Sequence, residues 1–170
     1  SYQKLLENSK KIGSGLGKFV KNNDPVPVYM EKGISALEVF MGALYSGGFY
    51  SLLNVGLPKM RLEQIINVLD VDYIVTDNEH LEDAKVFFPD KELILYEDLI
   101  KEEINDDLLN EIRKKKIDLD PVYANFTSGS TGVPKGVIVG NRSIIDFVDN
   151  FVDTFGIKDD DVIANQAPFD

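Results

Sequence analysis

Residues 125–137 read NFTSGSTGVPKGV, and this stretch separates two short apolar runs at Val122–Phe126 and Gly136–Val139. Between Thr127 and Gly136 the sequence holds three glycines, four hydroxyl side chains and one lysine. Glycines let the backbone adopt positive φ and bring N–H groups close to an anion, while Thr and Ser hydroxyls donate to phosphate oxygens. The stretch therefore predicts a phosphate-binding turn between two strands. A flexible Ser/Gly surface turn is the alternative that composition alone leaves open.

Lys135 is the only charged residue of this turn, in a chain whose 18 Lys and Arg against 29 Asp and Glu give a net charge of −11. This contrast favours an oligophosphate that is held locally by one ammonium group, with Pro134 restricting how the lysine enters the turn. The turn is not a P-loop, because that motif ends in Gly-Lys-Ser/Thr, whereas here Pro134 precedes Lys135 and Gly136 follows it. We therefore do not expect the mechanism of a P-loop nucleotidase.

The rest of the chain alternates short apolar runs with segments of helical periodicity, which predicts strands alternating with helices. The expected strands span 26–30, 49–53, 71–75, 93–96, 122–126, 136–139 and 161–164, and the expected helices lie within 2–19, 34–44, 62–69, 81–87, 97–116 and 144–155. This order predicts the α/β class, with three layers in which helices cover both faces of a largely parallel sheet. The segment 97–116 carries acidic residues first and basic residues last, as a solvated surface helix does; a partner-binding helix is the minority interpretation.

Composition excludes several functional classes. The chain has no cysteine, so a disulfide scaffold, a thiolate zinc site and a cysteine nucleophile are excluded, and His80 is the only histidine. A pI near 4.5 argues against nucleic acid as the main partner, because phosphate backbones require clustered Lys and Arg. No apolar run approaches the ~20 residues that span a bilayer, so no membrane span is expected. The lack of cysteine and of a signal-like segment predicts a cytoplasmic protein.

The turn resembles the AMP-binding signature of the adenylate-forming enzymes, which comprise acyl-CoA synthetases, luciferases and the amino-acid-activating domains of peptide synthetases. Ten positions carry the resemblance, from Thr127 to Gly136. Weaker similarities occur in the expected order along the chain, at Ser1-Tyr2-x-x-Leu5, at Leu44–Tyr50 followed by Pro58 and Arg61, and at Asn165–Asp170. The block at 44–50 and the run at 165–169 look most like amino-acid adenylation domains, and among these like the D-alanine–carrier protein ligases.

The resemblance implies a function and a set of site residues. It implies ATP-dependent activation of a carboxylate, an amino acid, as an acyl-adenylate, and transfer of the acyl group to the phosphopantetheine thiol of a carrier protein, with ATP and Mg²⁺ as cofactors. The residues expected to bind the β- and γ-phosphates are Thr127, Ser128, Gly129, Ser130, Thr131, Gly132 and Lys135. Lys135 is also the candidate catalytic residue, since it would neutralise charge on the leaving pyrophosphate. No residue is assigned as a metal ligand.

The resemblance also implies that residues 1–170 form a single partial domain, the N-terminal part of a larger AMP-binding domain, which would be inactive by itself. Two departures weaken the pattern: Asn54 stands where an aspartate is common, and Asn141 follows the signature where many members have a histidine. Asp170 falls about two residues before the family's substrate aspartate, so it is expected to be structural. An acyl-CoA synthetase for a fatty or aryl acid and a degenerate, non-catalytic module are the alternatives.

Three other features have simpler interpretations than catalysis. Gly13-Ser14-Gly15-Leu16-Gly17 lacks both the preceding strand and the last glycine of a dinucleotide fingerprint, so it is interpreted as a loose helix end. His80 is expected to be an exposed residue at the start of a helix. Asp159-Asp160-Asp161 is interpreted as a solvated turn, although such a run could hold a cation.

Overall fold

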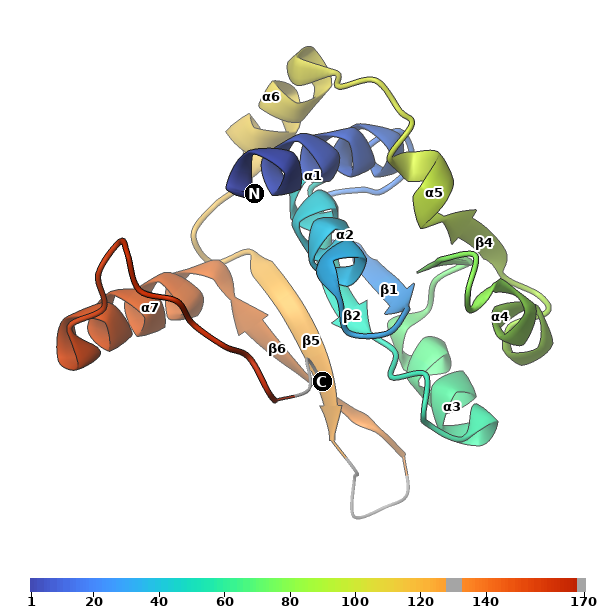
Figure 1. Ribbon diagram of the computed structural model, residues 1–170. Coiled ribbons are helices and arrows are strands. Elements are labelled where there is room, and N and C mark those ends of the chain that lie inside the picture. The colour runs from blue at the N-terminus through green and yellow to red at the C-terminus, as the bar shows by residue number, and fades with distance from the viewer. Residues whose placement is uncertain (128–132, 168–170) are drawn as a thin grey trace.

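The computed structural model describes residues 1–127 and 133–167, and in these residues six strands form one sheet in the order β4-β3-β1-β2-β5-β6 (Figure 1). Every neighbouring pair is parallel except β5 and β6, which are antiparallel. The strands are β1 (Pro25–Tyr29), β2 (Phe49–Leu52), β3 (Tyr73–Thr76), β4 (Glu92–Leu95), β5 (Pro121–Thr127) and β6 (Lys135–Gly140). The expected α/β class with a largely parallel sheet is confirmed.

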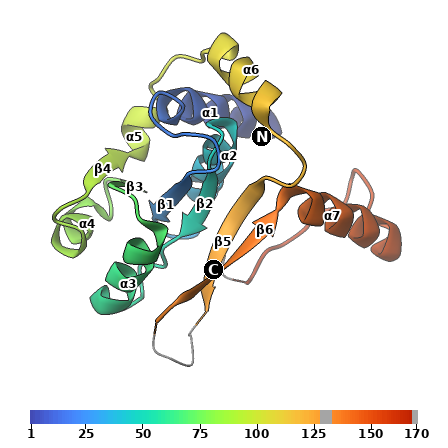
Figure 2. The ribbon, with the colours of Figure 1, turned by 180° about the vertical axis from the view of Figure 1, so that it is seen from behind.

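Helices cover both faces of the sheet, as Figures 1 and 2 show from opposite sides. The helices are α1 (Tyr2–Leu16), α2 (Ile34–Tyr45), α3 (Lys59–Leu69), α4 (Leu81–Phe87), α5 (Tyr96–Leu99), α6 (Asp106–Lys115) and α7 (Asn141–Phe155). Parallel strands are joined by right-handed crossovers, so connections that run in opposite directions along the sheet place their helices on opposite faces. The connections β1–β2 and β4–β5 run one way, and β2–β3 and β3–β4 run the other. Accordingly α2, α5 and α6 lie on one face, and α3 and α4 on the other.

Each face has its own hydrophobic core, and side chains of one strand alternate between them. Val75 of β3 belongs to the core beneath α1 and α2, with Ile12 and Phe40, whereas the adjacent Ile74 belongs to the core beneath α3 and α4, with Leu62. Burial on both faces explains why these strands read as continuous apolar runs in the sequence.

The glycines of the 13–17 run are contact points for other helices, which corrects the interpretation of this run as a loose helix end. A Cβ at Gly13 would lie 3.2 Å from the carbonyl oxygen of Gly42 and would overlap the Cβ of Tyr45, both in α2. A Cβ at Gly15 would lie 2.8 Å from a methyl group of Leu99 in α5. Small residues therefore let α1 lie close to its neighbouring helices. This close packing explains why glycines occur here although each of them lowers the helix propensity of α1.

Three other expectations differ from the structure. The residues 161–164 do not form a strand; they are exposed and irregular. The segment 97–116 is broken into α5 and α6, because Ile100–Asn105 leaves the helix to pass over α1, where the backbone N–H of Asn105 donates to Ser14 Oγ at 2.9 Å. His80 does precede a helix, but it is 8% exposed and therefore buried.

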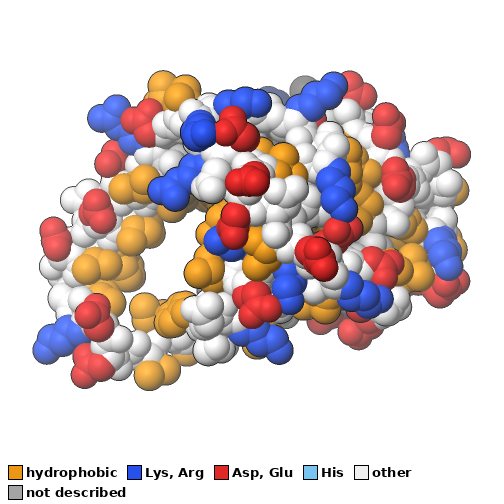
Figure 3. Space-filling model, turned by 90° about the horizontal axis from the view of Figure 1, so that it is seen from above, with side chains coloured by type: hydrophobic (Ala, Val, Ile, Leu, Met, Phe, Trp, Pro, Cys, Tyr) orange, Lys and Arg blue, Asp and Glu red, His pale blue; other side chains and the backbone are white. Residues whose placement is uncertain are grey.

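Helix α7 presents an uncovered apolar face. None of its fifteen residues, all of which the structure describes, is buried. Phe147 and Phe155 are 64% and 66% exposed, and both rings pack against that of Phe151. Val137 and Ile138 of β6 are also more than half exposed. Figure 3 shows hydrophobic side chains gathered around an opening between this helix and the rest of the molecule. Exposed apolar surfaces of this kind commonly mark interaction sites.

A buried carboxylate secures the entry to β5. Asp120 accepts hydrogen bonds from the backbone N–H of Ile117 at 2.9 Å and from the Asn23 amide at 3.0 Å, and it pairs with the Lys116 ammonium at 3.2 Å. Burial alone would raise the pKa of Asp120, but these three partners outweigh burial and hold the pKa below its ordinary value. The backbone carbonyl of Asp120 accepts from the N–H of Asn141, so the same residue connects β5 to the start of α7.

Within the described residues, no helix has both the length and the apolar character that crossing a bilayer requires.

Gly42→Ala should lower the free energy of unfolding by about 1–3 kcal/mol, because the added methyl group would lie 2.6 Å from the Cβ of Ile12 and force α1 and α2 apart. The better helix propensity of alanine, worth about 1 kcal/mol, opposes this loss. Urea denaturation measures the difference. Gly33→Ala is the control, because its Cβ would have no neighbour nearer than 4.0 Å. Equal stability of the two variants would contradict the close helix contact.

Asp120→Ala should lower stability at neutral pH by about 1–3 kcal/mol, because three donors lose a buried acceptor. The folded pKa of Asp120 is depressed, so its ionic contribution is present above the ordinary value of 3.8 and is lost as the pH falls through the lower folded value. Asp120→Asn should therefore flatten the loss of stability in acid, as measured by thermal unfolding at several pH values. Asp118→Asn, at an exposed carboxylate two residues away, should leave the acid profile unchanged.

Candidate functional site

The two ends of the signature turn meet at the carboxyl end of β5. Thr127 is the last residue of β5 and Lys135 is the first of β6, and the two are paired across the antiparallel ladder. The Thr127 hydroxyl also faces the Lys135 carbonyl oxygen, 3.5 Å away. Both side chains are exposed. A ligand at this place could therefore contact the hydroxyl and the ammonium group together.

This position belongs to the edge at which ligands bind in α/β sheets. The strands β1 to β5 are parallel, so all five carboxyl ends lie at one edge, and in such sheets ligands bind just outside it. In Figure 1 the carboxyl end of β5 is the lower end of that strand.

Aromatic rings fix β5 and β6 relative to the sheet. Tyr50 of β2 pairs with Tyr123 of β5, with their ring centroids 5.7 Å apart, and it also stacks on Phe40 of α2 at 4.1 Å. Burial, with the Tyr123 ring beside it, raises the pKa of Tyr50 to about 12, so this ring stays neutral and acts in packing. Gly136 lies opposite Phe126, where a Cβ would be 3.2 Å from the ring. The glycine therefore leaves room for Phe126 on the hairpin.

Arg61 holds the end of β5 from outside the strand. Its Nη2 donates to the carbonyl oxygen of Thr127 at 2.8 Å. Arg61 lies in the first turn of α3, the helix that follows the carboxyl end of β2. It therefore approaches the end of β5 from the connection that follows the neighbouring strand, β2. In the sequence Arg61 belongs to a block that resembles the family, but no spacing rule predicts that its partner is Thr127.

Lys32 brings the last described residues to the same edge. It follows β1, and its Nζ donates to the Asn165 carbonyl oxygen at 3.1 Å, and also to the Asn165 side-chain oxygen and the Ala167 carbonyl oxygen. The segment that leads into Pro168-Phe169-Asp170 thus crosses the carboxyl edge. Those three residues lie outside the described part of the chain.

His80 lies after the carboxyl end of β3 and is bound to its own turn. Its Nδ1 is 2.7 Å from Asp77 Oδ1, its backbone N–H donates to the same oxygen at 3.0 Å, and its ring lies edge-on to Tyr29. The expectation of an exposed His80 is wrong because Asp77 holds both the ring and the backbone N–H of His80 and turns the ring inward, against Tyr29. The arrangement gives His80 a structural role at the start of α4.

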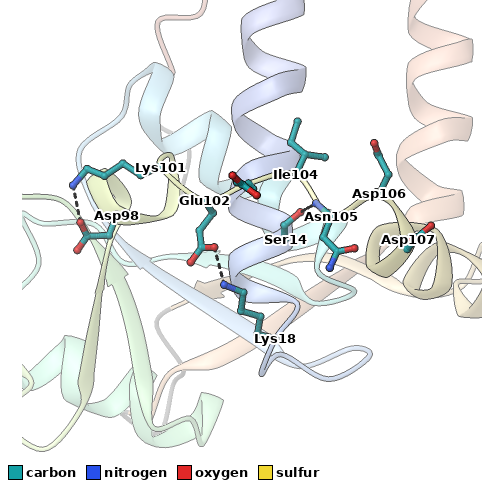
Figure 4. A pocket seen from close by; sticks show the side chains of 10 residues that line it. Ser14, Lys18, Asp98, Lys101, Glu102, Ile104, Asn105, Asp106 and Asp107 are labelled. Carbon is teal, nitrogen blue, oxygen red and sulfur yellow. Dashed lines mark hydrogen bonds and ion pairs between the residues drawn. The ribbon is translucent and has the colours of Figure 1, made fainter.

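A large hollow elsewhere on the molecule does not have the properties of an anion site. It has a volume of about 790 Å³ and lies between α1, α5 and α6, at the opposite end of the molecule from Thr127 (Figures 1 and 4). Five carboxylates line it, and two of them pair with lysines of the same hollow, Glu102 with Lys18 at 2.7 Å and Asp98 with Lys101 at 2.8 Å. Because carboxylates outnumber lysines in this lining, the surface would repel phosphate.

The structure thus brings together two of the expected site residues, Thr127 and Lys135. The other five, Ser128, Gly129, Ser130, Thr131 and Gly132, lie outside the described residues. Among residues 1–127 and 133–167, no three His, Asp or Glu side chains are grouped so that they could hold a metal ion. The acidic run 159–161 accordingly forms no such group.

Comparison with known proteins gives a consistent result. The chain matches the family described as AMP-binding enzyme over residues 1–170. It is 26% identical over 169 residues, or 99% of its length, to a D-alanine–D-alanyl carrier protein ligase of Lacticaseibacillus casei (strain BL23), and 31% identical over 157 residues, or 91% of its length, to surfactin synthase subunit 1 of Bacillus subtilis (strain 168). A crystal structure of a variant of the nonribosomal peptide synthetase FmoA3 in its AMPPNP-bound form superposes with a TM-score of 0.83 over 99% of the chain, at 21% identity.

The chain spans only part of these proteins. It covers 33% of the carrier protein ligase, 4% of the surfactin synthase subunit and 17% of the FmoA3 chain. The likeness to FmoA3 supports the fold, whereas the activity of a whole protein has to be argued separately.

Proposed function

Since this chain belongs to the family of AMP-binding enzymes, we propose that its protein activates an amino acid with ATP and transfers the aminoacyl group to the thiol of a carrier protein. The observation that carries the proposal is the pairing of Thr127 with Lys135 at the carboxyl edge of the sheet, where a hydroxyl and an ammonium group can meet one anion. A relative that is named as a D-alanine–D-alanyl carrier protein ligase supports the choice of a carrier protein as the acceptor.

The proposed reaction has two steps. A carboxylate oxygen of the amino acid attacks the α-phosphorus of ATP, and the bond to the bridging oxygen breaks, so that pyrophosphate leaves and an aminoacyl-adenylate forms. The carrier thiol, losing its proton, then attacks the aminoacyl carbonyl, and AMP leaves with the electron pair of the broken C–O bond. The first step creates charge on pyrophosphate, and stabilising a leaving group of this kind is the task that fixed donors and cations perform well.

We assign the phosphate contacts to the turn. Thr127, Ser128, Ser130 and Thr131 would donate hydroxyl hydrogens, Gly129 and Gly132 would donate backbone N–H groups, and Lys135 would supply a positive charge to the β- and γ-phosphates. Pro134 is buried directly before Lys135, so the backbone of the lysine is anchored although its side chain is exposed. An anchored backbone with a free ammonium group suits a residue that has to follow a moving phosphate.

We expect Mg²⁺ to bind at this site together with the nucleotide. The described residues near the turn offer a hydroxyl and an ammonium group, with no carboxylate cluster. Mg²⁺ is commonly bound by substrate phosphates and water with one or two carboxylates. The ion would therefore be held mainly by the phosphate oxygens of ATP, where it would supply further charge neutralisation.

We also propose that residues 1–170 are the N-terminal part of a larger domain. The coverage of 33% of the carrier protein ligase supports this, as does the uncovered apolar face of α7 and β6. In the longer protein, the chain that follows would pack on this face. Residues 1–170 alone would then lack part of both the core and the site.

The test of the function is ATP–pyrophosphate exchange by the longer protein with a panel of amino acids, fatty acids and aryl acids. Exchange with an amino acid is expected, and the isolated 170-residue chain should show none. Lys135→Ala should weaken ATP binding by about tenfold or more, because a charge-assisted contact to phosphate is lost. Calorimetry with ATP measures this effect independently of turnover.

Lys85→Ala is the matched control, because Lys85 is an exposed lysine of α4 that pairs only locally, with Glu82 at 2.6 Å. It should leave ATP affinity unchanged. ATP affinity unaffected by Lys135→Ala would contradict the role of Lys135. Exchange with a fatty or aryl acid alone would replace the proposed substrate class, and the absence of both exchange and ATP binding would favour a non-catalytic module.

The larger domain is tested with Phe147→Ala. In the longer protein this change should cost about 3–5 kcal/mol of stability, because the ring would be buried there. In the 170-residue chain, where the ring is 64% exposed, the cost should be below about 0.5 kcal/mol. Chemical denaturation measures both values. Asp149→Ala on the same helix should be near neutral in both forms, and an equal, small effect of Phe147→Ala in both would contradict the proposal.

A further inference from the structure

The carboxyl end of β5 receives little support from its parallel neighbour. The register between β2 and β5 consists of the pair Tyr50 and Tyr123, four residues before the strand ends at Thr127. The ladder of β5 with β6, on its other side, continues from Pro121 to Thr127. The strand end from which the phosphate-binding turn departs is therefore a two-stranded projection, and such ribbons twist and bend more readily than the middle of a sheet.

Arg61 contacts this projection on the side where β2 no longer pairs with β5. Its guanidinium donates to the Thr127 carbonyl oxygen at 2.8 Å, at the last residue of the strand. A hydrogen bond from a charged donor is stronger than one between neutral groups. The contact therefore acts at the residue where a displacement would most affect the turn.

The base of Arg61 is rigid, which a positioning residue requires. The turn before α3 is closed by two bonds to Asn54, from Gly56 N–H to its side-chain oxygen at 2.9 Å and from Leu57 N–H to its carbonyl oxygen at 3.0 Å. The N–H of Arg61 donates to the Pro58 carbonyl oxygen at 2.8 Å. The next residue, Leu62, is fully buried in the core beneath α3. Only the side chain of Arg61 is left to move.

The chemistry of arginine suits this place. The guanidinium group stays protonated at all physiological pH values and has five N–H donors in a planar fork, so it can hold a carbonyl oxygen with one nitrogen and keep others directed elsewhere. Its charge adds to that of Lys135 at the turn of a chain with a net charge of −11.

We propose that Arg61 is a positioning residue for the nucleotide: it fixes the carboxyl end of β5 so that the phosphate-binding turn starts from one place. This inference rests on the proposed function. The role differs from that of Lys135, because Arg61 acts through the Thr127 backbone.

The test uses Arg61→Ala and Arg61→Lys in the longer protein, with Lys59→Ala as the matched control. Lys59 is an exposed cation of the same helical turn that also donates to a backbone carbonyl oxygen at 2.8 Å, but that oxygen belongs to Val86 in α4. A general weakening of α3 would affect the variants alike. An effect through Thr127 would appear only in the two Arg61 variants.

Two measurements are made on each variant. In pyrophosphate exchange, Arg61→Ala should raise the KM for ATP by about tenfold while the KM for the amino acid stays within about twofold, and Arg61→Lys should lie between Arg61→Ala and the wild type. In amide hydrogen exchange, residues 124–127 should exchange about tenfold faster in Arg61→Ala. Lys59→Ala should change neither measurement.

The outcomes separate the two proposals. A wild-type protein without exchange activity or ATP binding would remove the proposed function, whereas hydrogen exchange at 124–127 would still show whether Arg61 holds the strand. Unchanged hydrogen exchange at 124–127 in Arg61→Ala would overturn the inference. An unchanged KM for ATP, or equal effects on the two KM values, would overturn it as well.

Discussion

The right-handed crossover between parallel strands is the constraint from which most of this structure follows. Because each connection must take this hand, the order β4-β3-β1-β2-β5 determines which helices lie on which face. The parallel direction of β1 to β5, which such crossovers allow, brings their carboxyl ends to one edge. Segments that are far apart in the sequence thus lie at the same edge: Lys32 after β1, the turn before α3, and Thr127 at the end of β5.

One of the two helical layers depends on close packing between its helices. Gly13 and Gly42 allow α1 and α2 to approach each other, and Gly15 does the same toward α5. Glycine lowers the intrinsic stability of a helix, so such a run is costly unless close contact gives something in return. The gain is dense packing around Ile12, which is fully buried, and a defined position for α1 over the sheet.

The site combines a rigid frame with exposed functional groups. The Tyr50–Tyr123 contact, the Asp120 network and the Arg61–Thr127 bond all act on β5, at its middle, its entry and its end. The side chains of Thr127 and Lys135 remain exposed between them. Holding the backbone while leaving donors open to a ligand is the usual way to preorganise an anion site.

The sequence by itself determined the class of the fold, most of the strands and helices, and the turn that carries the family resemblance. These are local properties: periodicity, glycine and proline positions, and a continuous ten-residue pattern. It gave a wrong account at three places, where tertiary packing, or its absence, decided the outcome. The glycines at 13–17 face α2 and α5, and His80 is turned inward by Asp77 against Tyr29; the apolar run at 161–164 pairs with no strand.

Only the tertiary structure decided which residues meet. The order of strands in the sheet determines three features: Arg61 reaches Thr127, Lys32 reaches Asn165, and α7 is left uncovered. No local pattern encodes these contacts, because they join segments between 66 and 133 residues apart. Strand order reflects the packing of the whole chain, and the contacts at the carboxyl edge exist only once that order is set.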